Sequence, residues 1–151
     1  MKSKLLIGML ILSLILGSCN SKDKKENSAE PNTVETTKSE NLKLQVYYFF
    51  SSHRCPTCVS IEENTKNVIE TNFKDEVERG IVQLAYIDIE DKSNKTLVEK
   101  LQVYSSSLIL VENKNGNEIV HDLTEYAYTY SRKQPSVFIQ GLTDSIQKYI
   151  N

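Results

Sequence analysis

Two cysteines separated by two residues, Cys55 and Cys58, are the side chains of this sequence best suited to chemistry. The apolar run 46–50 precedes them and predicts a buried strand, and helical periodicity begins at Pro56. A cysteine at a helix start lies near free backbone N–H groups and the positive end of the helix dipole, which favour its thiolate. Cys55 is therefore the expected nucleophile. Cys58, one turn into the helix, could form a disulfide with it or resolve a mixed disulfide.

Three neighbouring residues could support this chemistry. Pro56 suits the first helical position, because its ring presets φ where no N–H is needed. His53 could shuttle a proton or stabilise the thiolate, and Arg54 adds a positive charge. The alternatives are an ordinary loop histidine, a solvated arginine and, for the cysteines, an inert structural disulfide. His121 is interpreted as a surface or capping residue, and the tyrosines as packing residues.

The start of the chain has the pattern of a signal peptide: two lysines, then an apolar run over 5–16. That run is about 12 residues long, whereas a membrane-spanning helix needs about 20. The Leu-Gly-Ser-Cys sequence at 16–19 resembles the lipobox of bacterial lipoproteins, in which the cysteine is acylated. We therefore expect a lipoprotein signal peptide over residues 1–18 and a lipidated Cys19. A plain secretory signal is the alternative.

The segment after Cys19 is almost entirely polar and cannot bury enough surface to offset its ordering entropy. We expect a lipidated cysteine and flexible tether over 19–41 and a folded domain over 42–151. The 151-residue chain has room for one domain, and its net charge of −2 gives no bias toward nucleic acid. The lipid would anchor this domain to a membrane of the cell envelope, outside the cytoplasm.

Apolar spacing predicts an α/β domain. The expected elements are a strand over 42–50, an amphipathic helix from Pro56 to Phe73, a strand over 81–89, a short helix over about 93–102, hairpin strands 108–111 and 118–120 around Asn115-Gly116, a helix after a capping box at Asp122 to Glu125, and a last helix from Pro135. The first strand, helix and second strand imply a right-handed crossover and a parallel pair. Residues 126–130 could instead form an edge strand, but helix is favoured.

This order, with Cys55-Pro-Thr-Cys58 at the end of the first strand, resembles the thioredoxin fold over residues 42–150. The resemblance implies a three-layer α/β sandwich, with a central mixed sheet of about four strands and flanking helices. It also implies thiol–disulfide oxidoreductase activity, with Cys55 as the attacking cysteine and Cys58 as the resolving one. Asp88 resembles the acid that commonly ends the second central strand of that family.

The sequence departs from the family pattern at three places. Arg54 stands where an aromatic residue is usual, and Phe49 takes the position of the buried acid that relays a proton to the resolving cysteine. Ser106, by alignment on 108–111, takes the place of the cis-proline that faces the cysteines. A cis peptide is costly for a residue other than proline, so we expect a trans or locally rebuilt loop there.

These features predict a membrane-anchored thiol–disulfide oxidoreductase that needs no cofactor. Its partners would be protein thiols or disulfides and a separate electron donor, with no nucleic acid. One alternative is a lipoprotein that binds or transfers a soft metal or metalloid ion through Cys55, Cys58 and His53. Another is a non-catalytic thioredoxin-like interaction domain that keeps the disulfide as a structural link.

Overall fold

The structure is a computed structural model that describes residues 41–151. In chain order its elements are β1 (Leu44–Phe50), α1 (Pro56–Asn72), α2 (Lys74–Glu78), β2 (Val82–Asp88), the 3₁₀ turn η1 (Lys92–Asn94), α3 (Lys95–Lys100), β3 (Ser107–Lys114), β4 (Asn117–Asp122), α4 (Thr124–Tyr130) and α5 (Pro135–Ile150). The predicted signal peptide, Cys19 and nearly all of the predicted tether lie outside the described residues. No helix within the described residues has the length and apolar character needed to cross a bilayer.

The strands of the described domain form one mixed sheet in the order β2-β1-β3-β4. β1 is parallel to β2 and antiparallel to β3, and β3 is antiparallel to β4. Phe50 pairs with Asp88 at the carboxyl ends of these parallel strands, so the loops that follow β1 and β2 begin at the same end of the sheet. Asn115 and Gly116, with φ of 53° and 80°, form the tight turn between β3 and β4. The predicted parallel pair and hairpin are confirmed.

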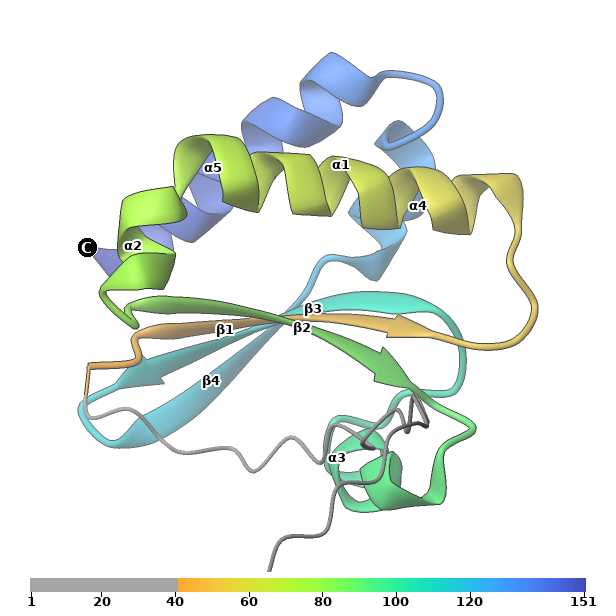
Figure 1. The fold of residues 1–151 in the computed structure, drawn as a ribbon, viewed down its shortest axis with the longest axis horizontal. Coiled ribbons are helices and arrows are strands. Elements are labelled where there is room, and N and C mark those ends of the chain that lie inside the picture. Colours follow the sequence, from red (N-terminus) through yellow and green to blue (C-terminus); the bar gives the residue numbers. More distant parts are fainter. Residues whose placement is uncertain (1–40) are drawn as a thin grey trace, which may run out of the picture. The chain divides into compact units, whose positions relative to one another are not determined.

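One face of the sheet, here called the helical face, is covered by α1, α4 and α5 (Figure 1). The central strand β1 contributes Leu44, Val46 and Tyr48 to it, and all three are fully buried. The helices and the Phe73 junction between α1 and α2 contribute Ile61, Val68, Ile69, Phe73, Ala127, Phe138, Leu142 and Ile146. The apolar stripes predicted for the long helices therefore face the sheet, and this layer holds the main core.

Within residues 41–151, the elements on the opposite face, here called the α3 face, are α3 and the turn η1 before it (Figure 1). Phe49 points to this side of β1 because neighbouring strand residues alternate between faces. Its buried cluster is Phe49, Ile87, Leu101, Val103, Ile109 and Val111. β1 is thus buried on both sides, as predicted from its apolar residues on both faces, and the domain has three layers.

Two helical regions differ in detail from the expected ones. Phe73 leaves helical geometry, with φ −131° and ψ 21°, while its side chain packs in the core, and the separate helix α2 follows it. The short helix expected over 93–102 begins as a 3₁₀ turn, because Asp91 accepts a hydrogen bond from Ser93 N at 2.8 Å. It ends before Gln102, which has a φ of 53°.

Helix α4 confirms the helical interpretation of residues 126–130, but the predicted capping box is wrong. The N-cap residue is Leu123, which makes no side-chain cap. The Asp122 carboxylate accepts a hydrogen bond from Thr124 N at 2.8 Å, and Thr124 Oγ1 accepts one from Leu108 N at 3.2 Å. Because Asp122 is the last residue of β4, its side chain is used to turn the chain into the helix.

Candidate redox site

Cys55 is the N-cap residue of α1 and has an extended backbone, with φ −75° and ψ 155°. Its Sγ accepts a hydrogen bond from Cys58 N at 3.0 Å, and its carbonyl accepts one from Val59 N at 3.0 Å. Pro56 occupies the first turn, where its missing N–H leaves no hydrogen bond unmade. The Cys55 sulfur therefore lies at the N–H end of a long helix, where a thiolate is favoured.

Cys55 and Cys58 form a disulfide, with their Cα atoms 5.0 Å apart. The two residues differ in access, because Cys58 is only 3% exposed and Cys55 is half-buried. The first turn of α1 contains no acidic residue, so no carboxylate there opposes the helix dipole. A reactant in solution would meet Cys55 first, and Cys58 would remain inside.

Two tyrosine hydroxyls contact Cys58. Tyr48, on β1, donates a hydrogen bond to Cys58 O at 2.7 Å, and the Tyr128 hydroxyl of α4 lies 3.4 Å from Cys58 Sγ. Burial raises the pKa of Tyr48, against lowering contributions from Arg54 and from a hydrogen bond with Ser106. Tyr48 is fully buried in the core, as the packing interpretation predicts, and the hydroxyls of both tyrosines contact Cys58 in addition.

Phe49, at the position where the thioredoxin resemblance implies an acid, lies on the opposite face of the sheet from Cys58. Phe49 packs on the α3 face, whereas α1 and Cys58 lie over the helical face. The neighbouring Tyr48 points to the correct side. Strand alternation is a signal that could have identified it, because Tyr48 shares a face with Val46. Tyr128 lies off the apolar stripe of α4, so nothing in its spacing indicates the contact.

Ser106 lies just before β3 and is only 5% exposed. Against the larger raising effect of burial, its hydroxyl lowers the pKa of Tyr48. Every peptide bond within residues 41–151 is trans, including the one before Ser106. The expectation of a trans loop at Ser106 is therefore confirmed, and the serine itself is buried.

His53 and Arg54 are both exposed in the loop before α1. Arg54 forms an ion pair with Glu62 of α1, and its guanidinium lies 5.2 Å from the centre of the Phe50 ring. Its charge is therefore partly balanced by Glu62 rather than directed only at Cys55. His53 lies two residues before Cys55, and its side chain is exposed to solvent.

His121 does not cap a helix, so that part of its interpretation was wrong. Its Nε2 lies 3.0 Å from Glu112 Oε2, and its ring stacks on Tyr149 of α5 with centroids 3.8 Å apart. The hydrogen bond with His121, helped by the charge of Lys114, lowers the pKa of Glu112 below its usual value, although desolvation opposes this. The pair joins the hairpin to the end of α5.

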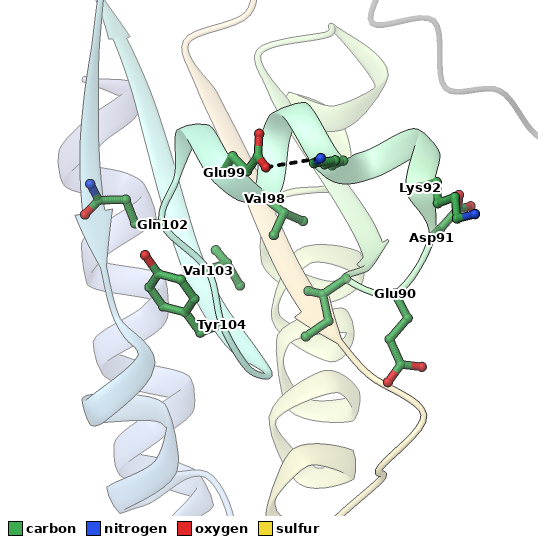
Figure 2. Close-up of a pocket in the computed structure, with 10 residues that line it drawn as sticks. Glu90, Asp91, Lys92, Val98, Glu99, Gln102, Val103 and Tyr104 are labelled. Atoms are coloured by element: carbon green, nitrogen blue, oxygen red, sulfur yellow. Dashed lines mark ion pairs between the residues drawn. The ribbon is translucent and has the colours of Figure 1, made fainter.

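A pocket of about 480 Å³ lies on the α3 face, between the chain that follows β2 and the segment that precedes β3 (Figure 2). Its lining residues are Ile89, Glu90, Asp91, Lys92, Lys95, Val98, Glu99, Gln102, Val103 and Tyr104. Glu90 accepts hydrogen bonds from Ser52 Oγ at 3.0 Å and Ser52 N at 3.3 Å, which tie the pocket to the loop before Cys55. Tyr104, at its other end, is 88% exposed.

Among residues 41–151, no three His, Cys, Asp or Glu side chains are grouped so that they could hold a metal ion. The described fold and site thus define a thioredoxin-like α/β domain, with a mixed four-stranded sheet, flanking helices and a close cysteine pair at a helix start. This combination suggests a redox function.

Comparison with known proteins adds little to this assignment. No family model matches the chain, and no curated protein matches it. Among solved structures, the chain is similar to a thioredoxin from Thermus thermophilus, with 15% identity, a TM-score of 0.45 and coverage of 69% of this chain and 74% of that one. It is also similar to a malarial protein, with 21% identity, a TM-score of 0.38 and coverage of 58% and 93%. The fold assignment therefore rests on strand order and helix placement.

Proposed function

We propose that this protein is a thiol–disulfide oxidoreductase whose working groups are Cys55 and Cys58. The observation that carries the proposal is the unequal placement of the two sulfurs. Cys55 is accessible at the N-terminus of α1, and Cys58 is buried behind it. A structural disulfide needs no such difference, whereas an exchange reaction needs one sulfur that meets the substrate and one that stays within reach.

In the reducing direction, the Cys55 thiolate attacks one sulfur of a substrate disulfide, and the other substrate sulfur leaves as a thiolate. Cys58 then attacks Cys55 Sγ, which forms the Cys55–Cys58 disulfide and releases the second substrate thiolate. The two electrons lost by the cysteine pair are those gained by the substrate. The oxidising direction is the reverse, beginning with a substrate thiolate that attacks Cys55.

The proposal includes a location outside the cytoplasm, at a membrane of the cell envelope. Its support is the sequence pattern of residues 1–41: a lipobox-like run ending at Cys19, followed by a polar tether. A Cys19→Ala variant should lose membrane association while keeping the reactivity of Cys55. Retention of this variant in salt-washed membranes would contradict the lipid anchor and leave the redox proposal intact.

The redox proposal is tested by trapping. In the full chain carrying Cys19→Ala, a Cys58→Ser variant should accumulate mixed disulfides through Cys55 with a protein disulfide substrate such as insulin. The matched Cys55→Ser variant should accumulate almost none, because Cys58 is buried. Non-reducing gels and mass spectrometry measure both. Equal trapping by the two variants, or none by either, would contradict the assigned roles.

A further inference from the structure

The proton of the Cys58 thiol needs a route out of the domain. Cys58 is 3% exposed, and it must become a thiolate before it can attack Cys55 Sγ in a mixed disulfide. In thioredoxins, as the family resemblance implies, a buried acid serves this step, but the corresponding Phe49 lies on the α3 face. Within the described residues, the one side-chain hydrogen-bond partner of Cys58 Sγ is the hydroxyl of Tyr128.

Tyr128 spans the distance between this sulfur and solvent. Its hydroxyl lies 3.4 Å from Cys58 Sγ, yet the residue is 39% exposed. Tyr48 cannot take the same role, because it is fully buried and its hydroxyl already donates to Cys58 O. Of the two tyrosines at Cys58, only Tyr128 has its hydroxyl beside the sulfur and part of its side chain exposed to solvent.

Helix α4 is attached to the helix that carries Cys58, which keeps Tyr128 in place. Ser131, which follows α4, accepts hydrogen bonds at its carbonyl from Ser60 Oγ and Asn64 Nδ2 of α1, each 2.9 Å long. Ala127, next to Tyr128, is fully buried against the core. The Tyr128 to Cys58 contact is therefore supported on both sides along α4 and does not depend on a free loop.

We propose that Tyr128 is a catalytic residue that relays the proton of Cys58 and hydrogen-bonds to its thiolate. This inference rests on the proposed oxidoreductase function. In the mixed disulfide, Cys58 Sγ passes its proton to the Tyr128 oxygen while the Tyr128 O–H passes its own proton to water, so the tyrosine remains neutral. The Cys58 thiolate then attacks Cys55 Sγ, the bond from Cys55 to the substrate breaks, and the substrate leaves as a thiolate that takes a proton from water.

The reverse reaction uses the same contact. When a substrate thiolate attacks Cys55, Cys58 leaves as a thiolate in a buried place, where an unpaired charge is costly. The Tyr128 hydroxyl then donates a hydrogen bond to it, and hydrogen bonds to charged groups are the stronger ones. Loss of the hydroxyl should therefore slow two steps: the deprotonation of Cys58 before it attacks Cys55, and the release of Cys58 as a thiolate in the reverse reaction.

The test separates attack at Cys55 from resolution by Cys58. The reduced full chain carrying Cys19→Ala, whose remaining thiols are Cys55 and Cys58, is mixed with the coloured disulfide DTNB. Attack by Cys55 releases one thionitrobenzoate at a rate that depends on DTNB concentration. Resolution by Cys58 releases the second at a rate that does not. Tyr128→Phe is compared with the matched control Tyr130→Phe, on the same helix.

We expect Tyr128→Phe to slow the second phase about tenfold at neutral pH and to shift its pH profile to higher pH, with the first phase unchanged. Tyr130→Phe should leave both phases and the profile unchanged. A second phase with wild-type rate and pH profile in Tyr128→Phe would overturn the role of Tyr128 alone. If the wild-type protein shows no second phase with a rate independent of DTNB concentration, the proposed function and this inference are both overturned.

Discussion

The two faces of the sheet differ in how many hydrophobic residues they bury, although the central strand β1 contributes side chains to both. We call the helical face the deep face and the α3 face the shallow face. On the helical face, fourteen buried hydrophobic residues join α1, α4 and α5 to the sheet. On the α3 face, a cluster of six lies under one short helix. The cysteine pair and both tyrosines that contact it belong to the helical face, whereas the pocket between Glu90 and Tyr104 belongs to the α3 face.

This difference suggests that the helical face holds the reacting groups and that the α3 face offers surface for contact with other molecules. Chemistry that depends on a sulfur, a hydroxyl and a helix terminus held at fixed distances is placed where packing is dense and rearrangement is costly. Contact with varied partners needs accessible surface, which the α3 face offers near Glu90 and Tyr104. The loop before Cys55 joins the two regions through Ser52 and Glu90.

The comparison is tested most strongly by the same truncation on each face. Leu142→Ala removes a fully buried side chain from the helical face and should lower the free energy of unfolding by about 4 kcal/mol. Leu101→Ala, at 9% exposure under the α3 face, should cost about 2 kcal/mol, because solvent and neighbouring chain can fill the space more easily. Urea unfolding of the oxidised proteins measures both. Equal losses would remove the distinction between a deep and a shallow face.

A smaller effect is expected at the far edge of the helical face, where Glu112 pairs with His121. The hydrogen bond from His121 lowers the pKa of Glu112, so the folded state favours the carboxylate. Its contribution to stability is therefore complete above about pH 4.5 and is lost as the pH falls through the lowered folded value. Glu112→Gln should cost about 1 kcal/mol at neutral pH.

The pH dependence of that cost identifies its cause. The difference in unfolding free energy between wild type and Glu112→Gln should shrink as the pH falls from about 4.5 through the lowered folded pKa of Glu112, below which both side chains are neutral. Urea unfolding at a series of pH values measures this difference. A gap that stays constant down to pH 2 would show that shape, and not charge, explains the loss.

The smallest effect on stability is expected for Tyr104→Ala on the α3 face. Tyr104 is 88% exposed, so its removal should change the unfolding free energy by less than about 0.5 kcal/mol. If the α3 face contacts protein substrates, the variant should reduce insulin more slowly and still react with DTNB at the wild-type rate. Parallel loss of both activities would place Tyr104 in the chemistry, against the division between the faces.

Much of the fold could be predicted from the sequence, because the signals for its elements are local. The apolar stripe of α5 and the Asn115-Gly116 turn each follow from neighbouring residues alone. The start of α1 at Cys55-Pro56 also follows from residue type and order. These features depend on local backbone preferences and hydrophobic spacing, both of which can be read from neighbouring residues in the sequence.

The contacts that complete the site could not be predicted in the same way. Tyr128 is 70 positions from Cys58 and meets it only because α4 packs beside α1. The expected capping box does not form, because Asp122 is the last residue of β4 and the N-cap of α4 is Leu123. Both depend on how elements meet in space, and residue spacing within one element carries no information about that.

The central claim, that Cys55 and Cys58 exchange electrons with a substrate, is tested most directly by the reduction potential of the pair. The full chain carrying Cys19→Ala is equilibrated with thiol–disulfide buffers, and free thiols are counted by alkylation and mass spectrometry. We predict one two-electron transition at a potential between about −270 and −120 mV, the range of dithiol catalysts. A pair that stays oxidised below about −300 mV would be a structural disulfide and would contradict the account.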